Sequence, residues 1–126
     1  MQITDGRELL NLKDNKFAGS VPKLKNSQIN IHGRNNIIAC EKNVSLWNSR
    51  IDFHGDNSVL YLSSNDFDYA LNISINGNNI CFIGKNNYFN GMTTIVLSES
   101  KNVIIGADCM FSYDVSIRVS DVHLIY

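Results

Sequence analysis

The pentapeptide INIHG at residues 29–33 returns as IDFHG at residues 51–55, ISING at 73–77, IVLSE at 95–99 and IRVSD at 117–121. Successive copies are 22 residues apart. Each copy begins with an isoleucine and has an apolar residue two positions later. A fixed period of this length is typical of repeat proteins, in which each copy is one structural unit stacked on the next. The aligned isoleucines are Ile29, Ile51, Ile73, Ile95 and Ile117.

Three further registers of the same period are largely apolar and predict additional positions of the stack. The first reads Ile38, Leu60, Phe82 and Ile104, the second reads Ala39, Tyr61, Ile83 and Ile105, and the third reads Ser45, Phe67, Phe89 and Phe111.

Within each copy, short segments that alternate apolar and polar residues predict strands. Clusters of Asn and Gly follow them and predict turns. The chain has 18 asparagines and one proline, and Asn enters the left-handed backbone region more readily than most residues. The sequence therefore predicts an all-β, single-stranded parallel β-helix of 22-residue coils, with equivalent residues stacked about 4.8 Å apart.

The spacing inside a coil favours three short sides. In the last full coil the apolar positions Phe89, Ile95, Ile105 and Phe111 include two steps of six residues. Such hexapeptide sides indicate a left-handed coil, whereas the handedness rule for parallel crossovers favours a right-handed β-helix.

The first residues predict a short capping helix over residues 4–13, with Asp5 as N-cap and Glu8 three residues later. We expect one domain over residues 1–126, with a cap at 1–16 and about five coils at 17–126.

The composition limits the partners. Eleven Lys and Arg balance twelve Asp and Glu, so no basic field for nucleic acid is expected. No apolar run is long enough to cross a bilayer, and MQITDGRELL lacks the pattern of a secretion signal, which predicts a cytoplasmic protein.

The three cysteines have no C-x-x-C spacing and are expected to be reduced thiols rather than metal ligands.

The segment 102–126, NVIIGADCMFSYDVSIRVSDVHLIY, resembles the left-handed β-helix, hexapeptide-repeat acyltransferases. It is most similar to bacterial O-acetyltransferases that act on sugars of capsule, sialic acid and lipopolysaccharide. The resemblance extends over roughly residues 17–126, because the upstream coils share its H-G-x-N corners. The matching residues are Ile105, Gly106, Cys109, Met110, Phe111, Ser112, Val115, Ile117, Arg118, Ser120, Asp121, His123 and Ile125.

This resemblance implies a homotrimer that uses acetyl-CoA in a groove between subunits. It implies that His123 is the general base that activates a sugar hydroxyl, a role that suits the near-neutral pKa of imidazole. Ser120 and Asp121 would help to bind the acceptor, and coenzyme-binding residues are not assigned. Val122 and Leu124 stand where the family usually has Gly and Pro. The family continues for several more coils, so either this chain is a truncated or inactive form that lacks them, or another chain covers its last coil.

The repeat register gives simpler interpretations of the same residues. His123 follows Asn35, Asn57, Asn79 and Lys101, which indicates an exposed turn residue. Lys101 itself either lines a substrate pocket one coil below the motif or is a solvated corner charge. His32 and His54 share a register that suits a metal pair, but a polar corner ladder explains them more simply. Trp47 shares its register with Tyr69, Gly91 and Tyr113, which predicts an exposed aromatic stack for sugar binding or trimer packing.

Three functions follow from these observations. The leading hypothesis is an acetyl-CoA-dependent O-acetyltransferase acting on a sugar or polysaccharide. The alternative is a non-catalytic trimeric scaffold or glycan-binding module. A right-handed β-helix lyase or hydrolase is disfavoured, because Asp52 and Asp56 have no carboxylate partner one coil further on.

Overall fold

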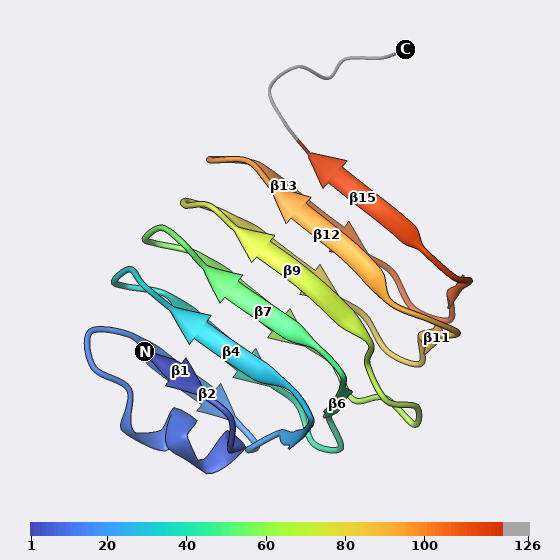
Figure 1. Ribbon diagram of the computed structural model, residues 1–126, viewed down its shortest axis with the longest axis horizontal. Coiled ribbons are helices and arrows are strands. Elements are labelled where there is room, and N and C mark those ends of the chain that lie inside the picture. Colours follow the sequence, from blue (N-terminus) through green and yellow to red (C-terminus); the bar gives the residue numbers. More distant parts are fainter. Residues whose placement is uncertain (120–126) are drawn as a thin grey trace.

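Residues 1–119 are described by a computed structural model, which is a parallel β-solenoid of about 5 turns (Figure 1). Short strands stack coil upon coil into three faces, which we call sheets A, B and C. Sheet A has the order β1-β4-β7-β9-β12-β15 and sheet B the order β13-β10-β8-β5-β2. Sheet C consists of the short pairs β3-β6 and β11-β14. The predicted all-β solenoid is confirmed.

The strands are two to five residues long, and each coil contributes one strand to each of the three sheets where it is complete. Their bounds are β1 Gln2–Ile3, β2 Lys16–Gly19, β3 Lys23–Lys25, β4 Gln28–Ile31, β5 Ile37–Cys40, β6 Ser45–Trp47, β7 Arg50–Phe53, β8 Val59–Leu62, β9 Leu71–Ile75, β10 Ile80–Ile83, β11 Tyr88–Phe89, β12 Thr93–Leu97, β13 Asn102–Ile105, β14 Met110–Phe111 and β15 Val115–Val119.

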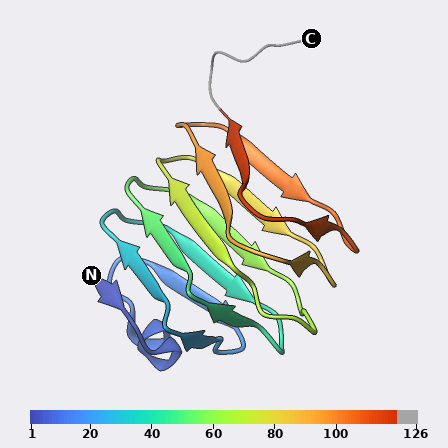
Figure 2. The same cartoon turned by 45° about the vertical axis from the view of Figure 1, so that its right-hand side comes forward.

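The coils wind in the left-handed sense. In Figure 1 the strands of sheet A lie in front and run toward the upper left, and the chain returns behind them to the lower right. Each such circuit moves the chain toward the upper right, from blue to red, and the turned view in Figure 2 shows the same winding. This agrees with the left-handed form that the hexapeptide sides predict, and not with the right-handed β-helix.

The isoleucine register of the sequence is the register of sheet A. Ile29 pairs with Ile51, Ile51 with Ile73, Ile73 with Ile95, and Ile95 with Ile117. The first four side chains are at most 1% exposed. They form a continuous column through the centre of the solenoid, so each coil is buried by its neighbours.

The predicted registers on sheet B are wrong at one step, from β8 to β10, and hold again from β10 to β13, where Phe82 pairs with Ile104 and Ile83 with Ile105. Leu60 pairs with Cys81, not with Phe82, and Leu62 pairs with Ile83. The spacing there is 21 residues, because the turn between β9 and β10 is one residue shorter than the turn between β7 and β8. Phe82 consequently faces outward and stacks on Tyr61, with ring centroids 4.9 Å apart.

The register predicted for sheet C is also wrong in one coil. Phe67 is 50% exposed, and the interior position belongs to Tyr69, which bridges to Leu46. Tyr69 is fully buried, and its hydroxyl donates to the Ser63 carbonyl oxygen at 2.6 Å. The stretch from Leu62 to Ile73 is as long as that from Cys40 to Ile51 in the coil before, so no residue is inserted; within it the inward position lies one residue later, at Tyr69.

The first coil is closed by the predicted cap. A 3-10 helix, η1 (Gly6–Asn11), begins after the N-cap Asp5, whose carboxylate accepts from Arg7 N–H. Glu8 accepts from the Asp5 N–H at 3.1 Å, which completes the capping box. Leu9 of this helix is 1% exposed and packs on the core. Within residues 1–119 no helix has the length and apolarity needed to cross a bilayer.

We predict that Ile73→Asp unfolds the chain. Ile73 is fully buried in the third coil, and an unpaired carboxylate there costs several kcal/mol. Far-UV circular dichroism and thermal melting measure the effect. The conservative variant Ile73→Val should cost only about 1 kcal/mol. A melting temperature of Ile73→Asp equal to that of Ile73→Val would contradict the buried column.

Candidate functional site

The corner between sheets A and B is where the sequence places the candidate site. We call it the first corner; its turns are residues 32–36, 54–58, 76–79 and 98–101. Each turn has one non-glycine residue in the left-handed region: Asn35, Asn57, Asn78 and Ser100, with φ of 57°, 60°, 54° and 65°. Asn is favoured here because its short polar side chain tolerates this conformation.

A ladder of buried side chains holds these turns together. Asn36 Oδ1 accepts from the Ser58 backbone N–H at 3.0 Å, and Ser58 Oγ accepts from the Asn79 N–H at 3.1 Å. Asn36 Nδ2 donates to the Gly55 carbonyl at 3.0 Å. All three residues are at most 1% exposed. These side chains satisfy backbone groups that the turns leave out of the sheets, so they are structural.

Three of the predicted site residues, Ser120, Asp121 and His123, lie outside the described residues. The fourth, Lys101, follows the last described turn of the first corner. Its backbone N–H donates to the Ser98 carbonyl at 3.1 Å, and its own carbonyl accepts from Asn79 Nδ2 at 2.5 Å. Its backbone thus belongs to the ladder at this corner.

The sequence predicted that His123 continues a polar register of Asn35, Asn57, Asn79 and Lys101. The structure shows that Asn57 and Asn79 do not share one register. Asn79 belongs with Asn36 and Ser58 in the ladder, and Asn57 lies beside Asn78. The cause is the same short turn that shifts sheet B by one residue.

The two histidines of the first corner form the predicted ladder. The rings of His32 and His54 are parallel within 5°, with centroids 6.0 Å apart. Within residues 1–119 no group of three or more His, Cys, Asp or Glu side chains is arranged to hold a metal ion. The stacked imidazoles are therefore explained by coil spacing.

The predicted exposed aromatic stack around Trp47 is wrong. Trp47 is 51% exposed, but Tyr69 is fully buried. The two cannot stack on the surface, because Tyr69 takes the inward position beside Leu46.

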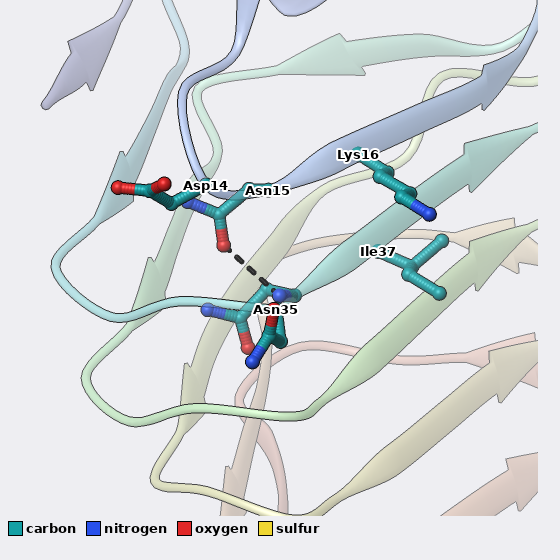
Figure 3. Close-up of a pocket in the computed structure, with 6 residues that line it drawn as sticks. Asp14, Asn15, Lys16, Asn35 and Ile37 are labelled. Carbon is teal, nitrogen blue, oxygen red and sulfur yellow. Dashed lines mark hydrogen bonds between the residues drawn. The ribbon is translucent and has the colours of Figure 1, made fainter.

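The first corner also lines a cavity of about 390 Å³ beside the first coil (Figure 3). Asn15 Oδ1 accepts from the Asn36 N–H at 2.9 Å across this cavity, and Asp14 and Lys16 point away from each other in Figure 3. The Asn15 amide oxygen thus extends the ladder to the first coil.

Sequence reasoning missed the outer surface of sheet B. Its outward side chains are mostly apolar, with Ile80 48% and Ile104 75% exposed. The outward face of sheet A is polar by comparison: Asp52 accepts from Asn30 Nδ2 at 2.7 Å and from Arg50 Nε at 2.9 Å. The outward side chains of sheet B also include the polar Lys16 and Asn102, at the two ends of the sheet. We call the apolar outward residues of β5, β8, β10 and β13 the apolar face; they are Ile37, Ala39, Val59, Tyr61, Ile80, Phe82 and Ile104.

The signal for this face was present in the sequence but ambiguous. Strands such as VLYL at 59–62 and ICFI at 80–83 are apolar at every position. Alternation cannot then tell inward from outward residues, and pairing is needed to assign them.

Comparison with known proteins assigns no family. No family model, curated protein or solved structure matches the chain.

We predict that Asn36→Ala lowers the free energy of unfolding by about 1–3 kcal/mol, because it leaves buried backbone groups of Ser58 and Gly55 without partners. Chemical denaturation measures the change. Asn72→Ala, at an exposed position of sheet A, serves as the control and should change stability by less than about 0.5 kcal/mol. Equal effects of the two substitutions would show that the ladder does not stabilise the corner.

Proposed function

We propose that this chain is an acetyl-CoA-dependent O-acetyltransferase solenoid that acts on a sugar hydroxyl, with His123 as general base. The observation that supports it most is the continuity of the repeat into the motif-bearing segment. The strands β13, β14 and β15 of that segment pair in register with β10, β11 and β12. The described part of that segment, residues 102–119, is thus a regular coil of a parallel β-solenoid, which supports the fold that the resemblance implies.

The proposed reaction needs one base and no covalent enzyme intermediate. A neutral His123 imidazole takes the proton of the acceptor hydroxyl as its oxygen attacks the thioester carbonyl of acetyl-CoA. The tetrahedral intermediate then expels the coenzyme thiolate, which takes the proton back from the imidazolium. Ser120, Asp121 and Lys101 are proposed to contact the acceptor. Acetyl-CoA is a co-substrate, and the setting is proposed to be cytoplasmic.

We predict that His123→Ala lowers kcat by about 10²–10⁴-fold, the usual contribution of a general base. The assay follows release of the coenzyme thiol from acetyl-CoA with a panel of hexoses and N-acetylhexosamines. His32→Ala is the matched control, since it removes an imidazole from the first corner of the second coil, and it should keep the full rate.

Two results would contradict the proposal. One is turnover that is the same in His123→Ala and in the unmodified chain. The other is no acetyl-CoA-dependent turnover with any acceptor, which would favour a non-catalytic solenoid.

The apolar face specifically favours that second candidate, a self-associating scaffold. Ile80 and Ile104 expose large aliphatic side chains on adjacent strands, where Ile104 pairs with the outward Phe82 and Ile80 with Asn102. Contiguous apolar surface of this kind marks interaction sites. We propose that copies of the chain associate through this face, as a homotrimer with three equivalent contacts.

For this candidate we predict that Ile80→Lys converts an oligomer into a monomer in sedimentation velocity runs at tens of micromolar. A lysine placed in an apolar contact is desolvated without a partner. Asn72→Lys adds the same charge on the polar face of sheet A and should leave the oligomer intact. An unmodified chain that sediments as a monomer rules out association through the apolar face.

A further inference from the structure

The outward side chains of sheet B form a column along the solenoid, and the aromatic rings in this column end at Tyr61. The column runs through Ala18, Ala39, Tyr61, Phe82 and Ile104 in paired positions. The rings of Tyr61 and Phe82 are stacked with centroids 4.9 Å apart and planes 19° apart. The next two coils on the other side of Tyr61 contribute alanines, so no ring continues the stack there.

The missing rings leave a hollow of about 470 Å³ against Tyr61. This size falls within the range of small-molecule sites, about 300–1,000 Å³. Its floor consists of the small residues Ala18, Gly19 and Ala39, and its rim is polar. We call it the Tyr61 hollow; it is lined by Ala18, Gly19, Ser20, Ala39, Cys40, Glu41, Lys42, Tyr61 and Ser64.

A carboxylate is fixed at the rim of this hollow. The Tyr61 hydroxyl donates to Glu41 Oε2 at 2.5 Å, and the Ser64 backbone N–H donates to Oε1 at 2.9 Å. These hydrogen bonds, that of Tyr61 first, hold the pKa of the Glu41 carboxyl below its usual range. The carboxylate is held in one orientation and keeps lone pairs for further donors.

We propose that the Tyr61 hollow binds one ring of a saccharide. A saccharide ring has a C–H face that packs against an aromatic ring, and hydroxyl donors at its edge that a carboxylate accepts. The coil spacing of about 4.8 Å leaves room over Ala39 for one such ring to extend the stack.

This site is separate from the proposed acetyl-transfer site. The strands of sheet B begin at the first corner, and the hollow lies at their opposite ends, where β2 and β5 lead out of the sheet. The saccharide site therefore does not depend on acetyl transfer. If both proposals hold, His123→Ala abolishes transfer and leaves binding in the hollow unchanged.

The test uses the full chain on an array of immobilised bacterial polysaccharides and oligosaccharides, followed by calorimetric titration of the glycan that binds best. Tyr61→Ala removes the stacking ring and should weaken binding about tenfold or more. Ala39→Phe fills the hollow with a ring that continues the stack, so it should abolish binding without lowering the melting temperature. Trp47→Ala, an exposed aromatic residue on sheet C, is the control and should bind as the unmodified chain does.

Three results would overturn the proposal. The first is no binding of the unmodified chain to any glycan on the array. The second is binding that survives Ala39→Phe, or that falls equally in Trp47→Ala. The third is an Ala39→Phe variant that keeps its glycan affinity and changes its oligomeric state, which would make the hollow part of an interface between copies of the chain.

Discussion

Parallel, in-register pairing of each coil with the next is the interaction on which the rest of this structure depends. Every inward side chain of sheet A rests on an equivalent side chain one coil away, as Ile51 rests on Ile29 and Ile73. No coil can bury its apolar residues alone, so stability is shared between neighbouring coils. The same pairing sets the outward side chains in columns, which gives sheet A a polar face and sheet B an apolar one.

At the corners the backbone must turn between sheets, which places residues at positive φ and leaves backbone groups outside the sheets. Among residues 1–119, eleven non-glycine residues have positive φ, and all are Asn, Asp or Ser. Buried amides and hydroxyls then satisfy the backbone groups that the turns leave unpaired; Asn87, for example, accepts from the Cys109 N–H and donates to the carbonyls of Gly84 and Gly106. The high asparagine content of the chain is thus explained by two local tasks, turning the backbone and bridging coils.

The sequence was sufficient for the fold, the coil length, the cap and the register of sheet A, because isoleucines recur there without a gap. It was insufficient for sheet B, where one turn loses a residue and every candidate position nearby is apolar, so Phe82 and Cys81 could not be told apart. Tyr69 was misplaced because the inward position in the polar segment 63–70 shifts by one residue while the coil length stays the same. At the candidate site, the sequence indicated the first corner and its histidine ladder. The Tyr61 hollow was missed because it arises from small residues, Ala18 and Ala39, that become informative once their pairing with Tyr61 is known.

The one-residue shift decides which side chains of sheet B face outward, so the apolar face and the Tyr61 hollow both depend on it. It can be measured directly in a Val59→Cys, Ile80→Cys, Cys109→Ser variant. Burial raises the pKa of the native Cys40 and Cys81 thiols to about 12, which keeps them unreactive in the folded chain. Paired residues in adjacent strands are close enough for a disulfide. Mild oxidation and mass-spectrometric mapping should find positions 59 and 80 joined in the folded protein. A bond from position 59 to Cys81 instead, as an unbroken 22-residue register requires, would contradict the structure described for sheet B.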